Sequence, residues 1–122
     1  MNDISDIMTE NIQIYKVSVN IPEEYADELM NSVNDIMKPI YPGYERAFTT
    51  FDVKGTWKTL KGSHPYNGKA GEITIADELR IEFAVYGKDL ESVINKIIEI
   101  HPYEEPGIDV IPMIGWKDLI RP

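Results

Sequence analysis

The sequence predicts an α+β fold, a ferredoxin-like βαββαβ sandwich in which a four-stranded antiparallel sheet carries both helices on one face. Two observations lead to this fold class. The segments KVSVNIPEEYADELMNSV and RIEFAVYGKDLESVINKI both pass from an alternating strand pattern into an amphipathic helix pattern. Each of these units is followed by one more segment with strand composition, so the chain consists of two βαβ halves.

The first half opens with IYKVSVNI, residues 14–21, in which apolar and polar side chains alternate as they do in a half-buried strand. Pro22 and the two glutamates after it favour a helix start, because proline fits the first turn and acidic side chains match the positive end of the helix dipole. Apolar residues then recur at helical spacing as far as Met37. Residues 44–53 are rich in aromatic, β-branched and threonine residues, which predicts a second strand that can continue through Trp57.

The second half begins after a long glycine-containing loop, which we place at residues 54–71 because it shows no hydrophobic period. The alternation in LRIEFAVY predicts a third strand at residues 79–86. The segment GKDLESVINKIIEI, residues 87–100, has an apolar stripe at three- and four-residue spacing and predicts the second helix. A short fourth strand is expected in IDVIPM, residues 108–113.

Composition narrows the class of protein. The 122 residues suit one domain over residues 1–122, and the chain lacks cysteine, which excludes disulfides, thiolate metal sites and a cysteine nucleophile. A cytoplasmic location follows as the expectation. The net charge of −9 opposes binding to nucleic acids and anionic membranes, and no apolar run approaches a membrane span. We expect residues 1–11 to be disordered or to form a short helix, and residues 114–122 to form a C-terminal tail.

Charge is distributed unevenly along the chain. Residues 53–71 contain no acidic side chain but four lysines, which are Lys54, Lys58, Lys61 and Lys69. One interpretation is a solvated loop that happens to be basic. The other is a docking site for a small anion, for which these lysines are the candidate ligand-binding residues.

The sheet of this fold has one face that no helix covers. Apolar residues fall on both sides of the predicted strands, among them Ala47, Phe51, Val53, Ala84 and Tyr86. A large apolar face without a cover predicts a partner subunit, and self-association needs only a second copy of the chain.

The segment HPYEEPG, residues 101–107, joins the second helix to the last strand and is called the corner below. Its prolines end the helix and stiffen the turn, so a structural role accounts for every residue, with His101 charged at the helix end beside a glutamate. The functional interpretation takes His101, Glu104 and Glu105 as ligands of a divalent ion, or His101 as an acid/base group. The chain has only two histidines, and both occur as His-Pro-Tyr, in the corner and in the long loop.

Motifs of common enzyme classes are missing from the sequence. It contains no phosphate-binding glycine loop, dinucleotide fingerprint, HExxH motif, serine elbow or zinc-finger spacing. An enzyme is therefore the less favoured class, with no catalytic residues assigned.

Three segments carry a resemblance to a known family. GTWKTLKGSHPYNGKAGEI, ELRIEFAV and IHPYEEPGIDVIPM resemble, in this order, the inserted domain of the NGG-interacting-factor-like family, toroidal dinuclear-metal proteins often labelled GTP cyclohydrolase type 2. The resemblance covers roughly residues 12 to 113, and the matching positions of its shared motif are His101, Tyr103, Glu104 and Glu105. The histidine-rich metal-binding halves of that family have no counterpart in this sequence, so cyclohydrolase activity is not implied.

The corner also resembles that of the CutA divalent-cation-tolerance family, in which an aromatic residue in the tail follows, as Trp116 does here. Both families share the fold of the PII signalling proteins. This resemblance implies a trimer whose sheets face a common centre, with ligands in clefts between subunits and an effector loop between the second and third strands. The basic loop occupies that position, and Tyr103 of the corner joins the candidate ligand-binding residues.

Three hypotheses of function follow. The first is a PII/CutA-like trimer, not an enzyme, that binds a small ligand or divalent ion at subunit clefts or regulates a partner through the basic loop. The second is a metal-dependent enzyme that uses the corner, with the ion completed by a neighbouring chain. The third is a purely structural oligomerisation module.

Overall fold

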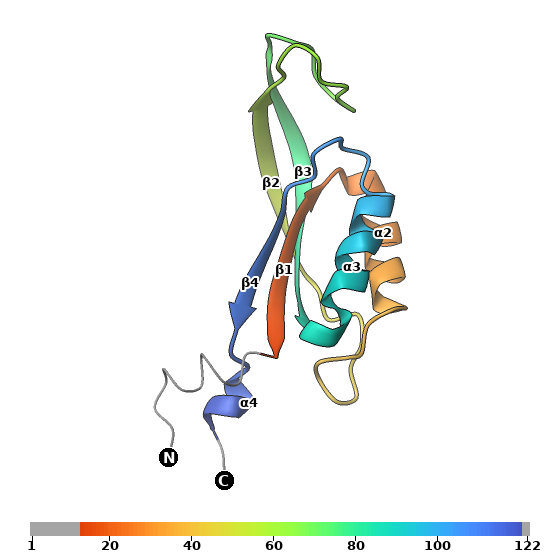
Figure 1. Cartoon of the computed structure of the whole chain (residues 1–122), viewed down its shortest axis with the longest axis vertical. Coiled ribbons are helices and arrows are strands. Elements are labelled where there is room, and N and C mark those ends of the chain that lie inside the picture. Colours follow the sequence, from red (N-terminus) through yellow and green to blue (C-terminus); the bar gives the residue numbers. More distant parts are fainter. Residues whose placement is uncertain (1–12, 121–122) are drawn as a thin grey trace.

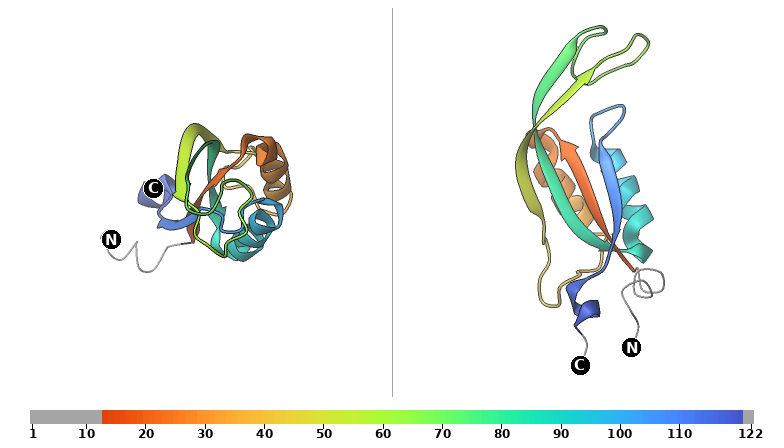
Figure 2. Two further views of the ribbon diagram at one scale, coloured as in Figure 1. Left: turned by 90° about the horizontal axis from the view of Figure 1, so that it is seen from above. Right: turned by 90° about the vertical axis from the view of Figure 1, so that its left-hand side faces the viewer.

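The computed structural model describes residues 13–120 and follows the predicted element order (Figure 1). Its elements are β1 (Ile14–Ile21), the 3-10 helix η1 (Glu23–Tyr25), α2 (Ala26–Asn34), β2 (Thr49–Lys58), β3 (Ile73–Tyr86), α3 (Gly87–Ile100), β4 (Ile108–Met113) and α4 (Trp116–Leu119). The strands form one antiparallel sheet in the order β2-β3-β1-β4, and α2 and α3 lie on the same face of it (Figures 1 and 2). The ferredoxin-like α+β sandwich is confirmed. The expectation for residues 1–11 lies outside the described residues.

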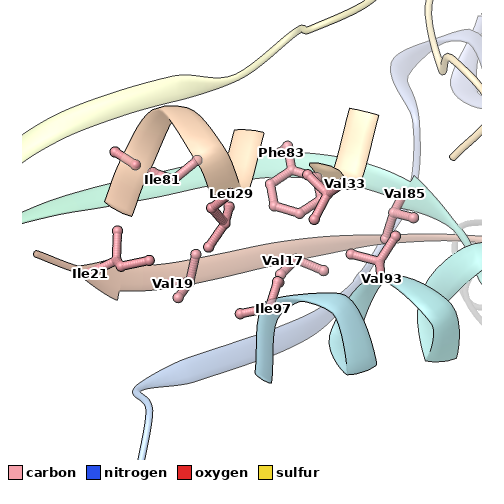
Figure 3. Packing of buried hydrophobic residues seen from close by; sticks show 11 residues of the cluster. Val17, Val19, Ile21, Leu29, Val33, Ile81, Phe83, Val85, Val93 and Ile97 are labelled. Carbon is pink, nitrogen blue, oxygen red and sulfur yellow. The ribbon is translucent and has the colours of Figure 1, made fainter. Parts of the chain in front are cut away.

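The core lies between the sheet and the two helices (Figure 3). Within the sheet, Val17 pairs with Phe83 and Val19 with Ile81, so their side chains share the helix-facing side. The helices contribute their apolar stripes, with Leu29 and Val33 of α2 and Val93 and Ile97 of α3 fully buried. Each such side chain adds about 1.5–3 kcal/mol of burial free energy, which is why the periodic segments fold as predicted.

The strand β2 is shifted along the chain from its predicted position, and β3 is longer than the sequence pattern predicts. β2 covers Thr49–Lys58 instead of residues 44–53, and β3 begins at Ile73 instead of residue 79. The residues of β3 that precede Leu79 are not paired with β1 and pair only with β2. This part of the hairpin, residues 54–77, is called the arm, and it projects beyond the helices (Figure 2). Its apolar side chains are not part of the core, since Ile73 and Ile75 are 71% and 69% exposed.

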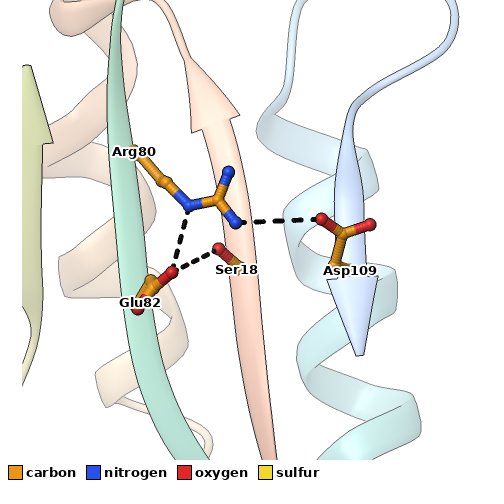
Figure 4. Close-up of polar contacts among 4 residues, drawn as sticks. All are labelled: Ser18, Arg80, Glu82 and Asp109. Carbon is orange, nitrogen blue, oxygen red and sulfur yellow. Dashed lines mark hydrogen bonds and ion pairs between the residues drawn. The ribbon is translucent and has the colours of Figure 1, made fainter. Parts of the chain in front are cut away.

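The sheet face opposite the helices is open within the chain, as predicted, but it is not uniformly apolar. Phe51 is 42% exposed and Ile111 is 51% exposed on this face. Between them lies a polar cluster of Ser18, Arg80, Glu82 and Asp109 (Figure 4).

The polar cluster is organised around the carboxylate of Glu82. Ser18 Oγ donates to Glu82 Oε2 at 3.1 Å, and Arg80 Nε donates to the same oxygen at 3.0 Å. A second nitrogen of Arg80 lies 3.9 Å from Asp109 Oδ2 on β4. The hydrogen bond from Arg80 is the main reason that the pKa of Glu82 lies below its ordinary value. The cluster therefore links β3 to β1 and β4 across the open face.

No helix among residues 13–120 is long and apolar enough to cross a membrane. The predicted C-terminal tail contains the short helix α4, and Trp116 on this helix is 59% exposed.

Candidate functional site

A cleft of about 530 Å³ lies where the arm folds back over the corner. Trp57, Lys58 and Thr59 line it from the arm, and Tyr103, Glu104 and Glu105 line it from the corner. The end of β1 contributes Asn20, and Glu78 of β3 completes the wall. Segments that lie far apart in the sequence thus meet around one cleft.

His101 fixes the corner to the end of β1. Its Nε2 lies 2.6 Å from the carbonyl oxygen of Asn20, and its Nδ1 accepts a hydrogen bond from the backbone N–H of Tyr103 at 3.2 Å. This arrangement requires a neutral ring that carries its proton on Nε2. Burial, which leaves His101 only 6% exposed, lowers the pKa of its imidazole below 6.5. The prediction of a charged histidine at the helix end thus does not hold, because desolvation outweighs the hydrogen bond to Asn20 and the attraction to Glu78, both of which raise the pKa.

Tyr103 carries the contact between the corner and β3. Its hydroxyl donates to Glu78 Oε2 at 2.6 Å, and Glu78 is 6% exposed. Burial, and then the hydrogen bond to Glu78, raise the pKa of Tyr103 far above its ordinary value of 10.0. Gly55 on β2 makes room for this pair, since a Cβ atom there would lie 2.8 Å from Glu78 Cδ.

The loop of the arm folds back on the corner through the second His-Pro-Tyr segment. The rings of Tyr66 and Tyr103 lie 5.8 Å apart, and the backbone N–H of His64 donates to Glu104 Oε1 at 3.0 Å. The hydroxyl of Tyr66 donates to Glu24 Oε1 at 3.0 Å, which raises the pKa of Tyr66 to about 12. The two copies of the tripeptide therefore meet through their tyrosines.

The four lysines of the basic stretch are not gathered at the cleft. Lys58 lines it, whereas Lys54 forms an exposed ion pair of 2.6 Å with Asp77 that raises the pKa of its ammonium. Lys61 and Lys69 are exposed on the loop and do not line the cleft. The predicted anion site at all four lysines stays a prediction.

The three predicted metal ligands have different surroundings. Both ring nitrogens of His101 are engaged within the chain, Glu104 accepts from the backbone of His64, and Glu105 is exposed at the rim of the cleft. Within residues 13–120 no group of three histidine, aspartate or glutamate side chains converges in a way that could hold a metal ion. The donor set of one chain therefore does not fit a divalent ion, and the predicted metal set stays a prediction that requires a neighbouring chain.

Sequence reasoning missed several residues of the cleft. Trp57 packs against Tyr103 with 5.4 Å between ring centroids, and Glu78 is the partner of the Tyr103 hydroxyl. Two polar atoms in the wall, Asn20 Oδ1 and Thr59 Oγ1, are buried and have no hydrogen-bond partner in the described part of the chain. The repeated His-Pro-Tyr was a usable signal for Tyr66. No pattern marks the others, because their role depends on the path of the arm.

No family model matches the chain. A GTP cyclohydrolase 1 type 2 homolog of Staphylococcus epidermidis is 34% identical over 113 residues, which are 93% of this chain and 31% of that protein. A solved Bacillus cereus protein related to NIF3 superposes with a TM-score of 0.73 at 25% identity, over 84% of this chain and 26% of that one. The divalent ion tolerance protein CutA1 from Ehrlichia chaffeensis superposes with a TM-score of 0.63 at 19% identity, over 90% of both chains.

The chain spans about a third of the length of the curated relatives that it matches. The similarity to CutA1 concerns the fold alone. Both results agree with the resemblance drawn from the sequence. The chain is thus a homologue of one segment of the GTP cyclohydrolase 1 type 2 homologues of the NIF3 family, and this segment has a PII/CutA-like, ferredoxin-like fold.

Proposed function

We propose that this chain is a self-associating module, not an enzyme, that binds a small molecule in the cleft between the arm and the corner. The observation that carries the proposal is the cleft itself, in which aromatic rings and polar groups from separate segments converge. The long β2–β3 connection supplies one wall, which suits a ligand-responsive loop. Cyclohydrolase activity is not part of the proposal, because the chain spans only about a third of the relatives so named.

Self-association is supported by the open face and by the strand edges. β2 and β4 are the two edge strands of the sheet, and Phe51 and Ile111 are exposed on the uncovered face. Exposed apolar side chains flanking a polar cluster suit an interface whose centre also fixes the mutual orientation of the subunits. We propose a trimer, in line with the PII/CutA-like fold, and a cytoplasmic location.

Light scattering on the purified chain tests the assembly. The expected mass is three times the 14.0 kDa of one chain. The double variant Phe51→Asp/Ile111→Asp should dissociate it, because each aspartate places a charge in the proposed interface. Ile98→Asp is the matched control, since Ile98 is 54% exposed on α3 and lies away from the open face. A monomeric wild-type chain at micromolar concentration contradicts the assembly.

A thermal-shift panel tests ligand binding. A ligand present at a hundredfold excess over its Kd should add about 2.7 kcal/mol to the free energy of unfolding. The panel comprises divalent ions, nucleotides, and small organic cations and anions. Replacing Trp57 by leucine should abolish the shift while leaving assembly intact, because Trp57 lines the cleft. A stable oligomer that responds to no compound favours the structural oligomerisation module instead.

A further inference from the structure

The charges of the cleft oppose the sign that the basic stretch suggests. Three carboxylates line the cleft, from Glu78, Glu104 and Glu105, whereas Lys58 supplies the single cationic side chain among the described lining residues. The other three lysines of the stretch do not line the cleft, and Lys54 is paired with Asp77. The local field therefore attracts cations and repels anions, in the same sense as the net charge of −9 of the whole chain.

Two polar side-chain atoms of the wall have no hydrogen-bond partner among the described residues. Thr59 is only 6% exposed, and its hydroxyl oxygen has no partner among the described residues. Asn20 Oδ1, also buried and unpaired, is an amide oxygen that can only accept a hydrogen bond. A buried acceptor without a donor costs about 1–3 kcal/mol. Both oxygens are closed off from solvent, so the N–H donors of a bound group satisfy them only when the wall of the cleft opens slightly.

The aromatic residues supply the third element. Trp57 and Tyr103 pack against each other and together form one aromatic wall of the cleft. The ring of Tyr66 lies 5.8 Å from that of Tyr103 and supports this wall from outside the lining of the cleft. Aromatic faces attract cations through the ring quadrupole, and a flat cation such as guanidinium also stacks on them.

We infer that the cleft binds a small organic cation whose head carries N–H donors, a guanidinium, amidinium or amino group lying between the Trp57–Tyr103 wall and the glutamates. This inference deepens the proposed function and rests on it. Among the described residues Lys58 is the lysine that lines the cleft, and its charge opposes multiply charged cations and so favours a ligand with a single charge.

An isosteric series of probes tests the charge class. Benzamidinium, benzamide and benzoate share one shape and differ in charge, and isothermal titration calorimetry of the assembled full chain compares their Kd values. We expect benzamidinium to bind at least about tenfold more tightly than the other two, the factor of one charge-assisted hydrogen bond. Equal or tighter binding of benzoate or benzamide overturns the cation inference while leaving a ligand-binding cleft in place.

Variants assign the binding to the cleft. Glu78→Gln and Glu105→Gln should each weaken benzamidinium binding, and Thr59→Val should weaken it without lowering the stability of the free protein. Glu105 and Thr59 keep the test valid if Glu78→Gln does not fold. Glu91→Gln, an exposed change on α3 outside the cleft, is the matched control and should leave the Kd unchanged.

Two outcomes contradict the inference. Benzamidinium binding that Glu105→Gln and Thr59→Val both leave unaltered overturns the assignment to the cleft. Absence of binding by all three probes overturns the inference, and a lack of any response in the thermal-shift panel then removes the proposed function as well.

Discussion

The hydroxyl of Tyr103 donates a hydrogen bond of 2.6 Å to the carboxylate of Glu78, and this contact joins the corner after α3 to the strand that carries the arm. Glu78 is only 6% exposed, and Tyr103 is half-buried. A carboxylate at such a position is tolerated only when it is hydrogen-bonded. The pair therefore sets the geometry of the cleft and also makes that region sensitive to substitution.

Loss of the Tyr103 hydroxyl should destabilise the protein. In Tyr103→Phe the Glu78 carboxylate remains buried without its donor, so we expect the free energy of unfolding to fall by about 1–3 kcal/mol in urea denaturation. Tyr66→Phe is the matched control, because its hydroxyl bonds to Glu24 at the surface and its removal should change the stability little. Equal losses for the two variants contradict the assigned role of Tyr103.

A methyl group at Gly55 should disrupt the same pair. The Cβ atom of Gly55→Ala would lie 2.8 Å from Glu78 Cδ, so the carboxylate has to move away from the Tyr103 hydroxyl. We expect a loss of about 1–3 kcal/mol in urea denaturation, the usual cost of overpacking. Gly107→Ala in the corner has no atom within 4 Å of the added Cβ and serves as the control. A Gly55→Ala variant as stable as Gly107→Ala refutes the close packing.

The neutral state of His101 should make stability depend on pH. Because burial lowers its pKa in the folded state, the unfolded chain binds the proton first as the pH falls below about 6.5. The contribution of the neutral His101 ring to the free energy of unfolding is therefore complete above that pH. It is lost progressively as the pH falls to the pKa of the folded state. We expect His101→Gln to be less stable at pH 7 and to lose less stability than the wild type between pH 7 and pH 5. His64→Gln, at an exposed position, should follow the wild-type profile. An unchanged profile in His101→Gln would falsify the neutral assignment.

Removal of Arg80 should raise the pKa of Glu82. The hydrogen bond from Arg80 is the largest cause of the lowered pKa, so it gives stability that is present above about pH 4.5 and is lost as the pH falls. In Arg80→Gln we expect carbon-detected NMR titration to show Glu82 protonating at higher pH than in the wild type. Lys96→Gln breaks an exposed ion pair with Glu99 on α3 and should leave the Glu82 titration in place.

The three most regular segments could be predicted from the sequence to the residue. β1, α3 and β4 have the predicted bounds of 14–21, 87–100 and 108–113. In β1 and α3 the period of the apolar residues matches the period of the backbone, and their buried side chains contact the common core. The helix α2 ends at Asn34, before the predicted Met37, and the chain then turns toward α3, where the backbone N–H of Lys38 donates to Asp89.

The candidate site could be predicted only in part. His101, Tyr103, Glu104 and Glu105 attract attention because their residue types and the prolines around them stand out in the sequence. Their partners do not, since Glu78 continues an ordinary strand pattern and the backbone carbonyl of Asn20 has no sequence signal at all. The basic stretch shows the same limit, because the pairing of Lys54 with Asp77 depends on the register of β2 against β3.

The sequence by itself determined the order of the elements, the core faces of the helices, the open sheet face and the place where α3 ends, since each follows from local periodicity and backbone chemistry. Only the tertiary structure decided that the arm bends back, that Tyr66 meets Tyr103, and that Glu78 lies buried beneath them. These contacts join residues that are 25 or more positions apart. Their stabilising free energy comes from packing and from hydrogen bonds shielded from water, which exist only after the chain has closed on itself.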